Sequence, residues 1–275
     1  MARPDPLASV GLGLVVTFAL IALAAPVLAT HDPAVIDAVR RLEGPSRLHF
    51  LGTDHLGRDL FSRLLYGSRW SLGTVVISTA LIMSIGVAVG TVAGYFGGLV
   101  DEILMRIVDV FLAFPSLLLA LAIAGMIGPG TGSVIAALAC VWWAGYARIV
   151  RGMVLALRER EFIAAARGLG ASDTHIVLRH VVPNMFAPVA ILATVEMGEL
   201  ILAVAALGFL GIGAQPPAPE WGAMVNDARP FLLSSPALMV YPGIAIALAV
   251  AGFNLLGDGL RDMLDPRAGR GFRGS

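Results

Sequence analysis

The sequence predicts an all-α protein that crosses a lipid bilayer six times. Its 275 residues are 57% apolar and 14% charged, and the mean hydropathy is +0.84. The charged fraction is about half that of a typical soluble domain. Six apolar windows each come close to the ~20 residues that a helix needs to cross the hydrocarbon core. The loops between them are too short to hold a separate enzymatic domain.

In chain order, the six windows lie at residues 7–29, 71–94, 103–127, 134–150, 187–210 and 237–256. We expect a membrane helix in the first window, because it is longer than the apolar region of a signal peptide and no clear cleavage site follows it. The third window contains Phe114 and Pro115, and proline there predicts a kink that serves gating or packing. Arg106 and Asp109 in the same window predict an ion pair within the helix, or an arginine that reaches the headgroups.

The sequence also predicts how the chain is divided and oriented. We expect residues 1–70 to form an anchor helix and an outer loop with an interfacial helix, and residues 71–275 to form the main transmembrane domain. The interfacial helix is predicted from apolar residues at positions 60, 61, 64 and 65 with arginines interleaved. Twelve of the 19 arginines fall on the side of the termini, so both termini are predicted to be cytoplasmic.

Several function classes are excluded by composition. All 19 basic residues are arginine, so the chain lacks the lysine that a P-loop ATPase or a Schiff-base enzyme requires. The net charge of zero gives no indication of nucleic-acid binding. The single cysteine, Cys140, can form no disulfide within the chain. The five histidines are expected in loops without metal-ligand spacing, so no metal site is predicted.

The longest predicted cytoplasmic segment contains a helical hairpin. Residues 161–169 favour a short helix closed by Gly170, and Ser172 is placed to cap a second helix that runs toward Pro183. Three alanines at positions 164–166 give the first helix a surface of small side chains. Such a surface suits docking of another protein, although an ordinary solvated loop is the alternative interpretation.

The hairpin resembles the EAA loop of ABC importer permeases, whose general form is E-A-A-x3-G-x9-I-x-L-P. Ala165, Ala166, Gly170 and Pro183 match the motif at its spacing, while Ala164 replaces the glutamate. Three further stretches resemble C-type permeases of dipeptide, oligopeptide and nickel importers. They are LGTDHLGRDLFSRLLYGSRWSL at 51–72, LGFLGIGAQPPAPEWG at 207–222 and GFNLLGDGLRDMLDPR at 252–267.

This resemblance implies the transmembrane domain of a type I ABC importer, with a cytoplasmic EAA coupling helix, in the inner membrane of a bacterium. The implied partners are a homologous second permease, two ATPase subunits or domains and an extracytoplasmic substrate-binding protein. The chain itself is then not an enzyme and holds no cofactor, because ATP and Mg²⁺ bind to the ATPase partners. The coupling role falls on Glu161, Ala164, Ala165, Ala166, Arg167, Gly168, Gly170 and Pro183.

The implied cargo is a di- or oligopeptide, with nickel or another small solute as the alternative. Glu196 and Glu199 share one face of the fifth span, where they either line the pathway or pack against a neighbouring helix. The proline-rich loop 211–236, which carries Glu220 and Trp221, is predicted to receive the binding protein or to anchor at the interface. An ion-coupled secondary transporter and a scaffold or channel without ATP coupling are lower-ranked alternatives.

Overall fold

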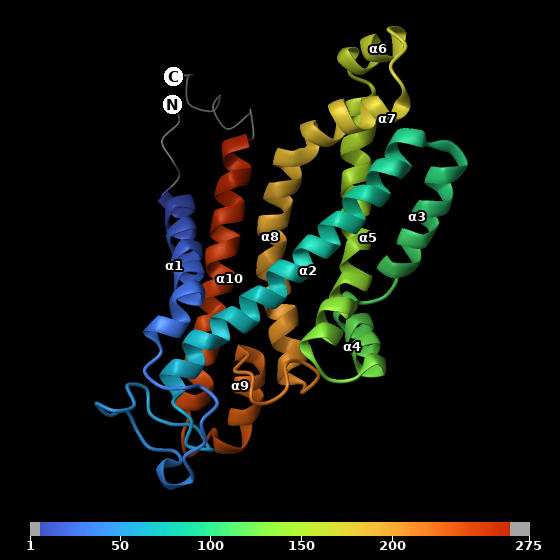
Figure 1. Cartoon of the computed structure of the whole chain (residues 1–275). Helices are drawn as coiled ribbons and strands as arrows, with labels where there is room; N and C mark the ends of the chain where they lie inside the picture. The colour runs from blue at the N-terminus through green and yellow to red at the C-terminus, as the bar shows by residue number, and fades with distance from the viewer. Residues whose placement is uncertain (1–5, 265–275) are drawn as a thin grey trace, which may run out of the picture. The chain divides into compact units, whose positions relative to one another are not determined.

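The computed structural model describes residues 6–264, and all regular secondary structure in this range is helical apart from one isolated bridge between Thr53 and Asp59. Arg3, Arg267, Arg270 and Arg273, which contribute to the charge asymmetry, and the end of the 252–267 motif lie outside the described residues. The α-helices are α1 Pro6–Leu28, α2 Leu60–Phe96, α3 Gly98–Leu112, α4 Ser116–Ile127, α5 Thr131–Arg158, α6 Glu161–Gly168, α7 Asp173–Ile176, α8 Val182–Phe209, α9 Trp221–Ala228 and α10 Ala237–Leu264 (Figure 1). Short 3₁₀ turns lie at Ala38–Arg40 and Arg229–Phe231, and a π-helical segment lies at Val177–Val181.

Within the described range, five helices are long and apolar enough to cross a membrane, and a bent pair makes a sixth span if it is counted as one. The bent pair is α3 with α4, whose axes differ by 87° at a break of three residues. The window 103–127 is therefore not one kinked helix, as predicted, but parts of two helices separated by a break. The break lies at Pro115, where a backbone N–H is missing and the helical hydrogen bonds cannot continue.

The first outer loop also differs from its prediction. The stretch predicted as an interfacial helix leading into the second span is the beginning of α2, which continues without a break from Leu60 to Phe96. Arg58 and Arg63, two of the arginines interleaved with its apolar residues, are both 3% exposed. They are buried because acidic partners compensate their charge, as described below.

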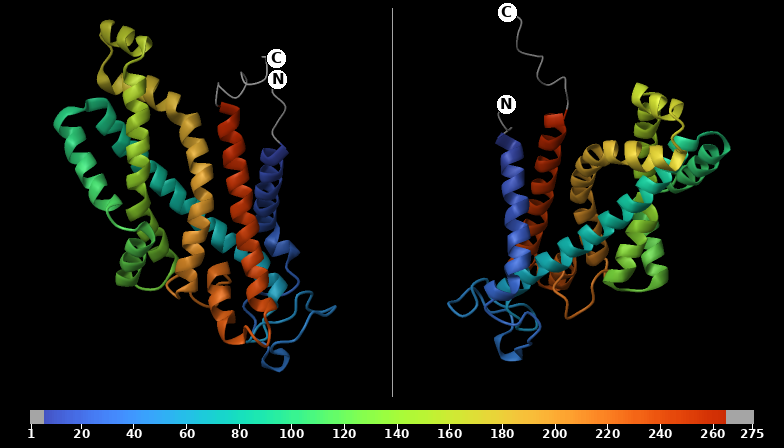
Figure 2. Two further views of the ribbon diagram at one scale, coloured as in Figure 1. Left: turned by 180° about the vertical axis from the view of Figure 1, so that it is seen from behind. Right: turned by 45° about the horizontal axis from the view of Figure 1, so that its top comes forward.

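The described chain divides into two compact units, and α2, α4, α5 and α8 each contribute residues to both. The first unit comprises residues 6–77, 124–135 and 194–264. In this unit α1 packs along α10, and the two helices run side by side in all views (Figures 1 and 2). The contact is close because Gly11 and Gly259 face the opposite backbone, where a Cβ atom would collide. Small residues permit such contact between membrane helices.

The second unit comprises residues 78–123 and 136–193. Here Gly86, Gly90 and Gly94, spaced four residues apart, form a stripe along α2 that packs directly on α5. A side chain at any of the three would overlap α5, so the stripe sets how closely the two helices approach.

Ion pairs join α3 to α5 within the same unit. Arg151 donates to Asp101 at 2.6 Å, and Arg148 donates to Asp109. The predicted pair within α3, Arg106 with Asp109, does not form, because Asp109 pairs with the neighbouring helix instead.

Candidate functional site

The helical hairpin that the sequence predicts within residues 159–184 is present, and its two caps, Gly170 and Ser172, are those expected. Gly170 has a φ of +82°, and hydrogen bonds from its N–H to Arg167 O and from Ala171 N–H to Ala166 O close α6. This left-handed glycine after the last helical turn is a common helix ending. Ser172 caps α7, where its hydroxyl accepts a hydrogen bond from His175 N–H. We call residues 161–176 the α6–α7 hairpin.

Two isoleucines attach the α6–α7 hairpin to the helices beside it. Ile163 on α6 and Ile176 on α7 are both fully buried. They share one apolar cluster with Tyr95 of α2 and Val154 of α5. The hairpin therefore packs against the ends of α2 and α5 (Figures 1 and 2).

Polar contacts around Tyr95 strengthen this attachment. The Tyr95 hydroxyl donates to Asp173 Oδ1 at 2.7 Å, and Arg158 donates to the Tyr95 carbonyl at 2.9 Å. The Arg167 guanidinium lies 6.0 Å from the centre of the Tyr95 ring. Its hydrogen bond to Tyr95 raises the pKa of Arg167, so that side chain stays charged. One tyrosine thus connects the end of α2 to α5, α6 and α7.

The opposite face of α6 is exposed and made of small side chains. Of the residues to which the resemblance gives the coupling role, Ala166 is half-buried and all the others are exposed. Leu169, which the sequence analysis did not single out, is 89% exposed and the next residue is Gly170. Its position at a helix end, directly before a capping glycine, is the sequence feature that could have predicted its exposure. Together these residues form a protruding surface that combines alanine, leucine and charge.

An open hollow of about 680 Å³ lies beside the first turn of α6. Glu159, Arg160, Glu161 and Asn184 supply its polar lining. Phe162 contributes a ring that is 42% exposed. The exposed surface of the α6–α7 hairpin therefore combines the protruding helix α6 with a hollow beside it.

Pro183 does not end the hairpin, contrary to the prediction. α7 continues through the π-helical turn Val177–Val181 into α8, and Pro183 is the second residue of α8. Val182 N–H bonds to Val177 O, five residues back, so the wider turn changes the hydrogen-bond register just before the proline. His175 and His180, expected in loops, lie on α7 and on this turn.

The two pathway candidates lie on the part of α8 that belongs to the first unit. Glu196 is half-buried and its Oε2 atom has no hydrogen-bond partner, whereas Glu199 is exposed. Gly198 between them faces the side chain of Asn254 on α10. This apolar part of α8 thus carries two acidic side chains, and the Asn254 amide of α10 packs against Gly198 between them.

Comparison with known proteins identifies the family. The profile of the binding-protein-dependent transport system inner membrane component matches residues 86–270, which is most of the chain. The chain belongs to this family. The permease is 46% identical to the dipeptide transport system permease protein DppC of Alkalihalophilus pseudofirmus over 96% of this chain and 87% of the relative. It is 44% identical to the nickel transport system permease protein NikC of Escherichia coli over 94% of each.

Two further comparisons concern cargo and fold. The glutathione transport system permease protein GsiD of Pectobacterium atrosepticum is 46% identical over 84% of this permease and 77% of its own length. The solved MetNI methionine ABC transporter, in inward-facing conformations, matches with a TM-score of 0.55 at 20% identity, over 74% of this chain and 96% of that chain. The permease therefore has the fold of an ABC importer transmembrane subunit and is a multi-pass protein of the inner membrane.

The permease contains a second organised region around the start of α2. Six polar side chains in it are each no more than 5% exposed, and we call them together the buried polar network: Asp54, Arg58, Asp59, Arg63, Ser71 and Glu220. Arg58 Nε donates to Asp54 Oδ2 at 2.6 Å, and Arg63 Nε lies 3.4 Å from the same oxygen. Two arginines thus share one carboxylate, and Asp227 lies 3.6 Å from Arg58 as a second partner.

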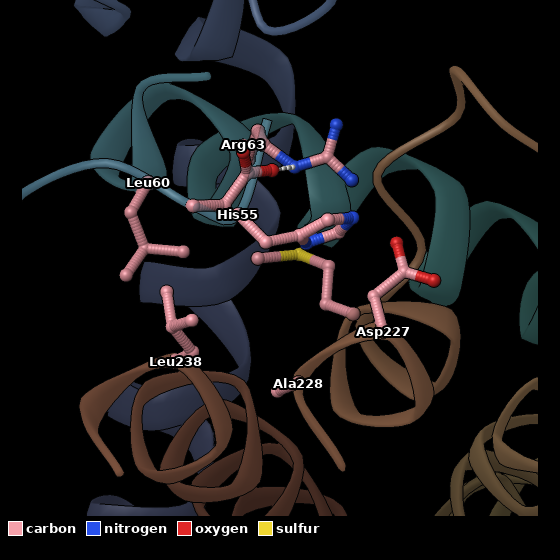
Figure 3. Close-up of a pocket in the computed structure, with 8 residues that line it drawn as sticks. His55, Leu60, Arg63, Asp227, Ala228 and Leu238 are labelled. Atoms are coloured by element: carbon pink, nitrogen blue, oxygen red, sulfur yellow. Dashed lines mark ion pairs between the residues drawn. The ribbon is translucent and has the colours of Figure 1, made fainter. Parts of the chain in front are cut away.

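A cavity of about 10 Å³, about the size of one water molecule, adjoins these charges. Figure 3 shows Arg63 and Asp227 on its polar side and Leu60 and Leu238 on its apolar side. The charges of the network are therefore compensated inside the protein and largely shielded from solvent.

Glu220 and Trp221 are neither a docking surface nor an interfacial anchor, since they are 2% and 1% exposed. Glu220 accepts hydrogen bonds from the N–H groups of Gly222 and Ala223, both at 2.8 Å, and from the Ser71 hydroxyl at 3.1 Å. Burial raises the pKa of Glu220, and these three hydrogen bonds offset part of the rise. Both side chains fasten α9 to α2, and the role predicted for the loop 211–236 stays a prediction for its other residues.

Three glycines make room for this arrangement. A Cβ atom at Gly208 would collide with the Glu220 carboxylate, and one at Gly67 would collide with the Trp221 ring. At Gly222 it would overlap the backbone at Ala205. The buried pair therefore depends on the absence of side chains around it.

Proposed function

We propose that the α6–α7 hairpin is the surface on which an ATPase subunit docks, so that ATP hydrolysis in that partner moves the helices of this permease. One observation carries the proposal: α6 exposes Glu161, Ala164 and Ala165 while Ile163 on its inner side is fully buried. A docked partner can approach the small side chains closely. When the partner moves, buried Ile163 then transmits the displacement to α2 and α5, on which it packs, as rigid-body motion.

The expected assembly follows from the same proposal. The chain supplies one half of a translocation pathway, and a homologous second permease supplies the other. Two ATPase subunits or domains bind ATP and Mg²⁺, while an extracytoplasmic binding protein delivers the solute. Both termini and the hairpin then lie in the cytoplasm, which agrees with the arginine content of residues 151–184.

The cargo we propose is a di- or oligopeptide, with Glu196 and Glu199 facing the pathway. A carboxylate pair in an apolar span suits the ammonium group of a peptide, and equally a divalent cation such as nickel. Dipeptide and glutathione permeases are among the similar proteins, and so is a nickel permease. Peptide uptake is therefore the first assay and nickel uptake the second.

The test is a substitution on the docking surface of the assembled transporter. In proteoliposomes that contain both permeases, the ATPases and the binding protein, Ala165→Glu should abolish ATP-driven uptake of a labelled dipeptide. Ala38→Glu is the matched control, because Ala38 is also an exposed alanine but lies in the loop after α1. Unchanged unfolding midpoints and membrane insertion would show that both variants fold. Normal uptake by a folded Ala165→Glu variant would refute the coupling role.

The same vesicles separate the alternatives. Uptake that requires ATP inside and persists after an ionophore collapses the ion gradients supports the proposal. Uptake without ATP that the ionophore abolishes supports an ion-coupled transporter, with Glu196 and Glu199 as the site to pursue. Replacement of the dipeptide by labelled Ni²⁺ then decides between the two cargo classes.

A further inference from the structure

One cluster of metal-ligating side chains lies outside the α6–α7 hairpin and outside the pathway candidates. Among the described residues, His31, His49 and Asp59 each offer one ligand atom, and these three atoms all lie within 4.8 Å of one another. His31 directly follows α1 and its turn, His49 lies in the long loop, and Asp59 immediately precedes α2. Segments well separated in sequence thus converge on one point.

Both imidazoles lie near one carboxylate oxygen of Asp59. His49 Nδ1 lies 2.8 Å and His31 Nδ1 lies 3.7 Å from Asp59 Oδ1. The two rings are inclined by 32°, with their centroids 4.7 Å apart. Small side-chain adjustments would place a cation among two nitrogens and one oxygen at bonding distances of about 2.0–2.2 Å.

The other oxygen of Asp59 is held by α2. Ser62 N–H donates to Asp59 Oδ2 at 2.8 Å, and the Thr30 hydroxyl lies 3.5 Å from the same atom. His31 N–H donates to the Ser62 hydroxyl at 3.0 Å, which fixes the first imidazole beside this helix start. Hydrogen bonds of this kind orient metal ligands before the ion arrives.

The cluster is buried on one side and reachable on the other. Asp59 and His49 are 2% and 5% exposed, but the His31 side chain retains 32% of its surface. His31 also lines an open hollow of about 440 Å³ together with Thr30, Asp32 and Tyr66. A hydrated cation can therefore approach from solvent, and Asp32 adds negative charge along the approach.

The ligand types select the cation. Two imidazoles and one carboxylate suit Zn²⁺, Ni²⁺ or Co²⁺, whereas Mg²⁺ and Ca²⁺ prefer oxygen ligands alone. Three protein ligands leave a fourth position for water. We propose that His31, His49 and Asp59 form a binding site for one divalent transition-metal ion, which ties the end of α1 to the start of α2. The proposal holds for either cargo, because it concerns the loop and not the pathway.

Cobalt is a suitable probe, because Co²⁺ bound to nitrogen ligands absorbs visible light. The full-length permease is purified with its partner subunits on a histidine-free tag, treated with EDTA and titrated with CoCl₂ in the absence of nucleotide. We expect one equivalent of Co²⁺ per chain, displaced by Zn²⁺, with a spectrum that indicates nitrogen ligation. Metal addition should also raise the unfolding midpoint.

The variants separate a metal site from a simple hydrogen-bond cluster. His49→Ala and His31→Ala should each weaken Co²⁺ binding by at least ~100-fold and remove the shift in midpoint, since even an outer hydrogen-bond partner contributes 10–100-fold in affinity. His55→Ala is the matched control, because His55 belongs to the same loop but stacks on Phe231 instead. It should bind Co²⁺ as the unaltered protein does.

Three results would overturn the proposal: absence of stoichiometric binding by the unaltered protein, equal binding by the His31→Ala and His49→Ala variants, or an equal loss with His55→Ala. If His49→Ala fails to fold, His31→Ala decides the matter, since its side chain is partly exposed. Uptake assays play no part in this test, so failure of the proposed transport function would leave its outcome intact.

Discussion

The buried polar network and the α6–α7 hairpin use opposite means to fix a backbone. The network holds its segments together with charges and hydrogen bonds that are almost completely withdrawn from water. The hairpin is held mainly by two buried isoleucines and one tyrosine, with Ala166 and Ala171 packed beside them, and most of its other side chains are exposed. The comparison teaches that buried ion pairs suit a part whose geometry must stay fixed, while a few apolar anchors suit a part that must present a surface.

The energetic reason lies in desolvation. A buried charge costs several kcal/mol when its partner is lost, so the network tolerates little rearrangement. An apolar anchor has no such partner requirement, so it can stay packed against the neighbouring helices and move together with them.

Asp54→Asn should destabilise the permease by about 3–5 kcal/mol, because Arg58 and Arg63 then share a neutral amide in place of a carboxylate. Unfolding in detergent by a chemical denaturant measures the loss. Asp37→Asn is the control, since the Asp37–Arg40 pair is 43% exposed on both sides and should contribute less than about 1 kcal/mol. Equal effects of the two changes would show that burial of the network does not matter.

Ile163→Ala should cost about 3 kcal/mol of local stability, because it leaves a cavity under α6. Hydrogen exchange of residues 161–176 should accelerate while the rest of the chain keeps its protection. Ile36→Ala, at a side chain that is 61% exposed, should leave exchange unchanged. Unaltered protection of the hairpin in the Ile163→Ala variant would mean that the apolar anchor is not what holds α6.

Tyr95→Phe should weaken the attachment of the hairpin by about 1 kcal/mol, the usual value of one hydrogen bond, here that to Asp173. ATPase activity should then respond less to the presence of binding protein. Tyr66→Phe is a fitting comparison, because the Tyr66 hydroxyl makes no hydrogen bond within residues 6–264. The idea fails if both phenylalanine variants show the same ATPase response.

The smallest effect concerns pH. The pKa of Glu220 is raised above 4.5 in the folded protein, so the folded state binds its proton more readily than the unfolded state does. Stability from this group is therefore present below about pH 4.5 and declines as pH rises through the raised pKa. As pH rises, the unfolding midpoint of the unaltered protein should fall relative to the midpoint of Glu220→Gln. A difference that stays constant with pH would contradict this.

The sequence was sufficient for the parts of the fold that local rules decide. The apolar windows identify the helices, and Gly170 and Ser172 define the ends of the hairpin, because hydropathy and capping act over a few residues. The break at Pro115 was expected only as a kink, since its angle depends on packing. The family motif predicts which residues form the proposed docking surface, but it does not predict that Ala166 is half-buried.

What the sequence missed are contacts between distant positions. Nothing local distinguishes Arg58 and Arg63, which are buried, from Arg69, which is exposed. Glu220 and Trp221 lie in a proline-rich loop, and their burial depends on distant positions, among them Ser71 and Gly208. The convergence of His31, His49 and Asp59 likewise depends on how a long loop folds back.

The glycines around Glu220 have a consequence for how this region tolerates mutation. Alanine is the mildest substitution elsewhere in a helix, yet at Gly208 it would occupy the space of the Glu220 carboxylate. A complete substitution survey should therefore find Gly67, Gly208 and Gly222 as intolerant as the charged residues, and any compensation should require paired changes.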